Sequence, residues 1–384
     1  MDFRLTEEQQ LIRESMTEFC KRYIKNEDVI EWGKQHRVPD SIYKAYLDEG
    51  FARLNMPEEY GGTEIDTLTT CLLNEEMFRN VAASMPFSGN AIIMRDILEM
   101  GTPEQIKIFY DNFEKTGVVR AALCISEPCA GSDNKAMITT TKSIGGGKYI
   151  LNGTKTFCTN AEYADYLLVI AKDESPERDN GSYTMWLVYK HQPGIKTSRL
   201  EKISACTAPF CEVYFDDVEL TESDILGKKG EGFVNLMKNF ETERISGCAN
   251  MLGAAQAAMD DAAAYAGVRV TFGKTLGQHQ LIQEKLVNME IRIQNMRNLI
   301  YKTAWEKDNG ISVRTSSALC KYYCANAATE VCSDALQIFG GLGYTNETRV
   351  GRLWLEMRGT QIAAGTNEMM IHIAGRQLVK QYAK

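Results

Sequence analysis

The stretch Leu123-Cys-Ile-Ser-Glu-Pro-Cys-Ala-Gly-Ser-Asp133 stands where a long helical pattern gives way to strand-like patterning. Leu123 and the two residues after it can finish a buried strand. Pro128 then fixes the backbone φ angle and removes a donor, and Gly131 allows close backbone approach. Such a loop can present backbone N–H groups and hydroxyls to a planar or phosphorylated ligand. A plain connection between two strands is the alternative interpretation.

Composition limits the classes of protein that the chain can belong to. A length of 384 residues indicates two or three packed units, and 44% hydrophobic with 24% charged content is typical of a globular protein. A net charge of -8 argues against nucleic acid and anionic membrane as partners. No apolar run approaches the ~20 residues that span a bilayer. The start of the chain resembles neither a signal peptide nor a transit peptide, so we expect a cytoplasmic protein without membrane insertion.

The cysteine and histidine pattern predicts no metal site. There are eleven cysteines without a Cys-x-x-Cys pair, and four histidines that do not cluster with them at ligand spacing. Cys320, Cys324 and Cys332 lie near helical spacing, and we expect them to pack as small buried hydrophobic residues.

Helical patterning dominates the first part of the chain, which we assign to a domain of residues 1–117. Thr6-Glu-Glu-Gln9 matches a capping box, and apolar residues follow it at helical spacing as far as Ile24. Further helices are expected from Pro39 to near Gly50, at 66–84 and at 89–115, with a break near Gly101-Thr-Pro103.

Strand-like patterning marks a middle domain, assigned to residues 118–225. Short strands are separated by turns such as Gly145-Gly-Gly and Asp179-Asn-Gly181, which predicts a small antiparallel barrel or sandwich. The expected strands cover residues 148–157, 166–171, 185–189 and 211–215.

The helical period returns after Gly230-Glu-Gly232 and continues to the end, which we assign to a domain of residues 226–384. Long helices joined by short loops predict an antiparallel bundle of the four-helix type. Helices are expected near 231–267, 277–308, 313–339, 345–358 and 366–382.

Four motifs in order resemble the signatures of the acyl-CoA dehydrogenases, and the resemblance extends over essentially the whole chain. They are the stretch 123–133, Arg269-Val-Thr-Phe-Gly273, Gln337-Ile-Phe-Gly-Gly-Leu-Gly343 and Ala364-Gly-Thr-Asn-Glu368. The resemblance implies a mostly α-helical fold with a central β unit. It also implies non-covalent FAD, an acyl-CoA or enoyl-CoA substrate, an electron-transfer flavoprotein as redox partner, and a homotetramer.

Two shorter stretches resemble, within this family, the bacterial crotonobetainyl-CoA reductases and related short-chain acyl-CoA dehydrogenases. They are Asn239-Phe-Glu-Thr-Glu-Arg244 and Thr156-Phe-Cys-Thr159. The implied chemistry is α,β-oxidoreduction of a thioester, in which a carboxylate takes an α-proton and a hydride passes between substrate Cβ and flavin N5. The sequence leaves open both the acyl group and the physiological direction, dehydrogenation or reduction.

The resemblance also assigns residues to the cofactor and the substrate. Phe157 stands where the family often has Trp, and Cys129 stands where it usually has Gly. Arg269 matches the arginine that neutralises the flavin pyrophosphate. The residues implied to line the flavin edge and wall are Leu123, Ile125, Ser126, Phe157 and Thr159. Those implied to meet its ribityl and adenosine portions are Phe272, Gln280, Gln337, Gly340, Gly341, Thr366 and Glu368, and those implied to contact the substrate are Ser132, Phe240 and Arg244.

Glu243 is the predicted catalytic base, because Ala364 stands where many family members carry their glutamate. Members without that glutamate place one directly before an arginine on the first helix of the C-terminal bundle, and Glu243-Arg244 matches this position. Helical spacing puts Glu243 on one face with Phe240 and Gly247, where burial would raise the pKa of its carboxyl. The backbone N–H of Ala364 matches the family's donor to the thioester oxygen.

Several alternatives remain open at this stage. Glu243-Arg244 could be an exposed ion pair, and Glu241 is the rival carboxylate on another face. Arg269 could be a surface cation at a helix end, and the glycines after Gln337 only a helix terminator. The competing functions on the same fold are those of an acyl-CoA oxidase, a flavin monooxygenase, or a catalytically silent paralogue that binds flavin or CoA.

Overall fold

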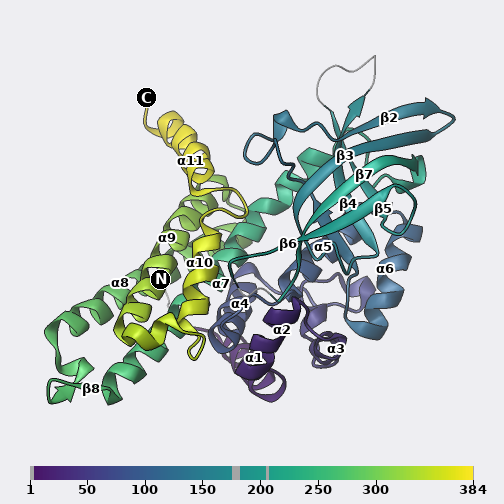
Figure 1. Ribbon diagram of the computed structural model, residues 1–384. Helices are drawn as coiled ribbons and strands as arrows, with labels where there is room; N and C mark the ends of the chain where they lie inside the picture. Colours follow the sequence, from purple (N-terminus) through teal and green to yellow (C-terminus); the bar gives the residue numbers. More distant parts are fainter. Residues whose placement is uncertain (1–3, 175–181, 205–206, 384) are drawn as a thin grey trace.

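The structure is a computed structural model that describes residues 4–174, 182–204 and 207–383, without the side chains of 88 and 237–239. The turn expected at Asp179-Asn-Gly181 and the side chain of Asn239 therefore lie outside the described part. Within that part, no helix is both long and apolar enough to cross a membrane. Figure 1 shows a curled sheet on one side, a long helical bundle on the other, and the N-terminal helices beneath both.

The N-terminal helices begin and end mostly where the sequence predicts. Helix α1 starts at the expected capping box, in which the Gln9 N–H donates to Thr6 Oγ1 at 3.2 Å and the Thr6 N–H donates to Gln9 Oε1 at 3.1 Å. Helix α2 was not predicted, because its ten residues carry only a short apolar stripe around Val29 and Trp32. The helices are α1 (Glu7–Tyr23), α2 (Asn26–Gln35), α3 (Asp40–Asp48), α4 (Thr67–Val81), α5 (Phe87–Met100) and α6 (Pro103–Thr116).

The middle of the chain forms a seven-stranded sheet with the order β1-β4-β2-β3-β7-β6, in which β5 also pairs with β4. Most ladders are antiparallel as expected, but β1 and β2 both pair with β4 in parallel, so the sheet is mixed. Parallel pairing requires long connections, which are hard to predict from local patterning. The strands are β1 (Ala121–Cys124), β2 (Thr140–Gly145), β3 (Lys148–Thr159), β4 (Tyr166–Glu174), β5 (Tyr183–Tyr189), β6 (Ile195–Leu200) and β7 (Phe210–Thr221).

The C-terminal helices pack around α7, which has 37 residues and is therefore about 55 Å long. Its buried face consists largely of alanines, which let α9 approach closely. A two-stranded hairpin follows α7. The elements are α7 (Gly232–Val268), β8 (Val270–Thr271), β9 (Lys274–Thr275), α8 (Gln280–Asp308), α9 (Arg314–Phe339), α10 (Val350–Thr360) and α11 (Asn367–Tyr382).

Buried charges fix the N-terminal helices to the bundle. Glu75 of α4 is 1% exposed and accepts hydrogen bonds from Arg297 at 3.0 Å and from the Tyr301 hydroxyl at 2.8 Å, both on α8. These charge-assisted hydrogen bonds satisfy the buried carboxylate and fix the position of α4 relative to α8. Glu75 thus links α4 directly to α8.

Candidate active site

A buried ion pair holds the loop that follows β1. Lys155 Nζ lies 2.8 Å from Glu127 Oε1, and both side chains are fully buried. The same amine donates to the Ile125 carbonyl at 2.9 Å, while the Glu127 carboxylate accepts the N–H groups of Ile138 at 2.7 Å and Thr139 at 3.1 Å. Burial raises the pKa of Glu127, but these hydrogen bonds outweigh it and leave the pKa lowered. Sequence reasoning missed this pair.

The loop lies directly beside the exposed end of β3. The Ser126 carbonyl accepts the Thr156 N–H at 2.8 Å. Phe157 is 56% exposed, has a φ of 60°, and stacks on Phe210 with ring centroids 5.4 Å apart. Thr159 is also exposed two residues later, so its side chain emerges on the same face as Phe157. The structure thus brings together most of the residues assigned to the flavin wall, namely Ile125, Ser126, Phe157 and Thr159, with Leu123 partly buried in the preceding strand.

The turn at Cys129 does not need the glycine that the family usually has. Glu127 and Ala130 exchange two backbone hydrogen bonds of 3.0 Å, which closes the turn. The backbone φ of Cys129 is not positive, so a side chain is tolerated there without strain. Ser132 follows on an exposed segment, where its hydroxyl is open to solvent.

Glu243 lies near the start of α7, partly buried, and its carboxyl has a perturbed pKa. Burial raises the pKa to about 7, the negative charge of Asp96 adds to this rise, and Arg95 and Arg244 oppose it. One turn further on, a Cβ added to Gly247 would meet no atom within 4 Å. Phe240, one turn before Glu243, packs against the apolar cluster between the sheet and α5 and α6. Along the helix, Glu243 thus stands between an aromatic residue one turn before it and a glycine with free space around it one turn after it.

Arg244 is a partly buried cation with an unsatisfied donor. Its Nε is buried and has no hydrogen-bond partner among the described residues. Burial lowers the pKa of the guanidinium, while Glu241 and Glu243 raise it. Because a buried donor without an acceptor is costly, this arrangement favours a polar ligand group next to Arg244.

The loop between α10 and α11 presents the backbone of Ala364. This exposed residue has a φ of 54°, a conformation that disfavours a Cβ by roughly 1–2 kcal/mol. Within the described part of the chain, its N–H donates to no backbone carbonyl. The next residue, Gly365, has a φ of 88°. The loop thus contains two consecutive residues with left-handed backbone, the first of which carries an N–H without a backbone acceptor among the described residues.

Lys321 of α9 holds this loop through buried hydrogen bonds, and sequence reasoning missed it. Its amine donates to the Gly365 carbonyl at 2.7 Å and to Asn367 Oδ1 at 3.3 Å, and the residue is 1% exposed. The pKa of Lys321 is lowered to about 8, mainly by burial and also by the charge of Arg244, while Cys248 opposes the shift. The available signal was a lysine within the otherwise small and apolar run that begins at Ala318.

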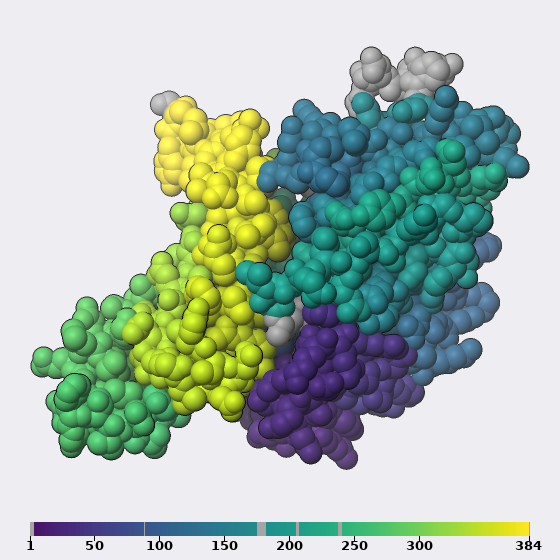
Figure 2. Space-filling view, viewed as in Figure 1, coloured from purple at the N-terminus to yellow at the C-terminus, as the bar shows by residue number. Residues whose placement is uncertain are grey.

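Thr366 and Glu368 stand at the start of α11. The Thr366 hydroxyl accepts the Met369 N–H at 3.3 Å, so it serves as the helix N-cap. Glu368 is exposed, and hydrogen bonds from its own backbone N–H and from Thr366 lower the pKa of its carboxyl. The sheet and this C-terminal segment face each other across a hollow in the surface, blue to teal against yellow in Figure 2.

The remaining predicted cofactor residues form a separate group at the far end of the bundle. Arg269 caps α7 at its C-terminus and lies about 39 Å along the helix from Glu243. Tyr265 of α7 stacks on Phe339 of α9 with ring centroids 4.3 Å apart, which brings the two helix ends together. Phe272 is 94% exposed at the tip of the hairpin. All six residues of this group are exposed at this end of the bundle: Arg269, Phe272, Gln280, Gln337, Gly340 and Gly341.

The fold and these sites define the class of protein. Family models for the acyl-CoA dehydrogenase N-terminal, middle and C-terminal domains match residues 6–112, 122–218 and 230–379. The chain belongs to the acyl-CoA dehydrogenase family and is an oxidoreductase. It is 43% identical over 382 residues to the probable acyl-CoA dehydrogenase YdiO of Escherichia coli strain K12, covering 100% of this chain and 99% of that protein.

Solved structures share the whole fold. Butyryl-CoA dehydrogenase from Megasphaera elsdenii is 30% identical with a TM-score of 0.88, covering 99% of this chain and 100% of its own. An FAD complex of PigA is 26% identical with a TM-score of 0.89, again covering 99% of this chain and 100% of its own. The predicted fold class, helices on either side of a central β unit, is confirmed.

Proposed function

We propose that the chain catalyses FAD-dependent α,β-oxidoreduction of an acyl-CoA thioester, as a dehydrogenase or an enoyl-CoA reductase, with Glu243 as the catalytic base. The observation that carries the proposal is the state of the Glu243 carboxyl. Its pKa is raised to about 7, close to that of an efficient general base at neutral pH, and Gly247, one helical turn further on, leaves free space beside the helix. Position 364, where the family's usual glutamate would stand, carries alanine.

The residues on the exposed end of β3 fit a flavin. Phe157 offers a flat apolar face, and Thr159 adds a hydroxyl beside it on the same side of the strand. The solved FAD complex of a relative with the same fold supports this assignment. When bound there, FAD would supply the hydride acceptor or donor at N5.

The chain's own groups would handle the proton and the developing negative charge. Glu243 removes the α-proton, or returns it in the reducing direction. The Ala364 N–H, which donates to no backbone carbonyl in the described structure, would stabilise the thioester oxygen as enolate character develops. Arg244, with its unsatisfied Nε, would hold a polar part of the acyl-CoA beside the base.

A short acyl chain is the proposed substrate class, with crotonobetainyl-CoA as one candidate. The solved butyryl-CoA dehydrogenase shares the fold over the whole chain. The space at Gly247 lies one helical turn after Glu243, and the aromatic Phe240 lies one turn before it. An aromatic face suits the quaternary ammonium of a carnitine-like acyl group.

The separation of the two groups of cofactor residues supports an oligomer. Arg269 and Glu243 are about 39 Å apart on one rigid helix, so they cannot act at the same point of one bound flavin. We therefore assign the group around Arg269 to a flavin held mainly by a neighbouring subunit, in a homotetramer. An electron-transfer flavoprotein is the proposed redox partner, because the sequence carries no second dinucleotide-binding motif.

Anaerobic titration of the purified protein with a panel of acyl-CoA and enoyl-CoA thioesters tests the proposal. We expect bound flavin that is bleached by an acyl-CoA, or reoxidised by an enoyl-CoA after reduction. Protein that takes up no FAD would overturn the proposal. Bound FAD that no thioester bleaches would favour the silent paralogue, and fast oxygen consumption by the reduced protein would favour an oxidase or monooxygenase.

A further inference from the structure

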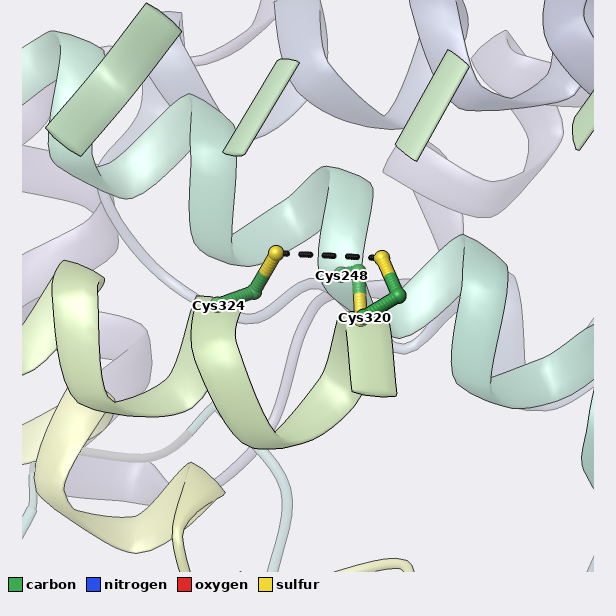
Figure 3. Close-up of side chains that lie close together, drawn as sticks. All are labelled: Cys248, Cys320 and Cys324. Carbon is green, nitrogen blue, oxygen red and sulfur yellow. Dashed lines mark hydrogen bonds between the residues drawn. The ribbon is translucent and has the colours of Figure 1, made fainter. Parts of the chain in front are cut away.

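Three cysteine thiols meet in the core of the bundle, one turn of α7 beyond Arg244. Cys320 and Cys324 stand four residues apart on one face of α9, and Cys248 of α7 faces both, as Figure 3 shows. The three Sγ atoms lie within 4.8 Å of one another, and those of Cys320 and Cys324 are 3.8 Å apart. Each residue is 0% exposed. The sequence predicted buried cysteines on α9 but not their meeting with Cys248.

These separations match the spacing that a metal ion imposes on thiolates. A metal–sulfur distance of about 2.3 Å places three sulfurs around one ion about 4 Å apart. The observed sulfurs need only small side-chain rotations to reach that spacing. Among the described residues, this is the only group of three or more cysteine, histidine or acidic side chains with ligand atoms so close together.

The surroundings carry positive charge that suits a trithiolate. The cations of Lys321 and Arg244 both lie close enough to interact electrostatically with the sulfur of Cys248. The other groups near the cluster are the Cys71 thiol and the Thr303 hydroxyl, which hydrogen-bonds to Cys320. A monovalent ion bound by three thiolates has a net charge of -2, which the two cations balance.

The number of ligands selects the kind of ion. Structural zinc sites take four protein ligands, and the described cluster supplies three. Soft thiolate ligands favour Cu(I) among the biological metals, and complete burial excludes water as an additional ligand. Cu(I) is stable with three sulfur ligands, so it fits both the number and the softness of the donors.

We propose that Cys248, Cys320 and Cys324 form a trithiolate binding site for a Cu(I) ion. Three copper–sulfur bonds form as the three thiols lose their protons to solvent, and no electron is transferred because the ion enters as Cu(I). Cys248 follows Arg244 by one helical turn, so occupancy adds negative charge next to the cation that flanks Glu243. The site is independent of the proposed catalytic function.

The test is anaerobic transfer of Cu(I) to the reduced holoprotein from its bathocuproine disulfonate complex. The matched pair of variants is Cys320→Ala and Cys332→Ala, since Cys332 is equally buried on the same helix but outside the cluster. We expect wild type and Cys332→Ala to take up one ion per chain. Cys320→Ala should bind it at least about 100-fold more weakly, because even outer-shell changes cost roughly 10–100-fold.

Two results would overturn the proposal. One is equal Cu(I) affinity of Cys320→Ala and Cys332→Ala, which would assign uptake to other thiols such as the exposed Cys129. The other is an X-ray absorption spectrum of the wild-type complex with fewer than three sulfur ligands per copper. The second measurement needs no variant, so it decides the question even if Cys320→Ala fails to fold. Flavin content and circular dichroism report on folding separately from copper uptake.

Discussion

Replacing Glu243 with glutamine should abolish most turnover while making the folded protein more stable at neutral pH. Glutamine keeps the size of the side chain but cannot accept the α-proton. Loss of a positioned general base costs about 10²–10⁴ in rate. In the wild type, the rate of dehydrogenation should rise with pH and level off above about 7, because only the ionised carboxyl is a base.

The stability change follows from the pKa of the same group. A carboxyl with a pKa of about 7 in the folded chain and about 4.3 when unfolded is harder to ionise in the folded state by about 3–4 kcal/mol. Between these two pKa values the folded state binds the extra proton, so wild-type stability falls as pH rises, and the loss is complete above about 7. Glu243→Gln has no such loss. Its advantage over the wild type should be near zero at pH 4 and at most about 3–4 kcal/mol at pH 8.

The assay combines steady-state kinetics with urea unfolding of wild type, Glu243→Gln and the control Glu241→Gln across this pH range. Glu241 lies two residues away on another face of α7, so its replacement should preserve both turnover and the pH dependence of stability. Near-normal turnover of Glu243→Gln, together with loss of turnover in Glu241→Gln, would refute the assignment. A stability difference that does not grow with pH would refute the argument from burial.

Three further substitutions probe the other parts of the site. Arg269→Ala should weaken FAD retention by about 1.5–3 kcal/mol, measured as flavin loss on dilution, and unchanged retention would make Arg269 structural. Lys321→Met should lower kcat by roughly 5–100-fold with flavin content unchanged, because the loop of Ala364 loses its buried donor; an unchanged kcat would contradict this role. Gly247→Ala should raise KM for the longest accepted acyl-CoA but not the shortest, and should stabilise α7 by about 0.5–1 kcal/mol. An equal change in KM for all chain lengths would contradict an acyl site at this position.

Local signals in the sequence were sufficient to predict most elements of the fold. The capping box at Thr6 fixes the start of α1, and the break at Gly101-Thr-Pro103 separates α5 from α6. These signals are local because each depends on residues within one turn of helix. The two parallel ladders to β4 were not predicted, because strand direction depends on connections that local patterning does not specify.

Buried charged residues mark the limit of sequence reasoning at the site. Lys155 and Glu127 are 28 residues apart, and Lys321 lies 44 residues before the carbonyl that it holds. A lysine or glutamate is normally a surface residue, so only its partner shows that it is buried. Glu243 was predicted as the base because the reaction requires a carboxylate and position 364 lacks one, and this assignment stays a proposal. The supporting cations carry no such chemical requirement and were missed.

In the proposed mechanism, a base on α7 separates two tasks that the loop at Ala364 would otherwise combine. The loop at Ala364 has only to hold a backbone N–H in place, and Lys321 fixes it through the Gly365 carbonyl at 2.7 Å. Glu243 depends instead on burial at the start of α7, which is the main cause of its raised pKa. The two elements meet through the like charges of Lys321 and Arg244, which lower the pKa of the lysine. Because Lys321 is 1% exposed, its part in the proposed mechanism is to hold the loop in place, while the Ala364 N–H itself would stabilise the developing negative charge on the thioester oxygen.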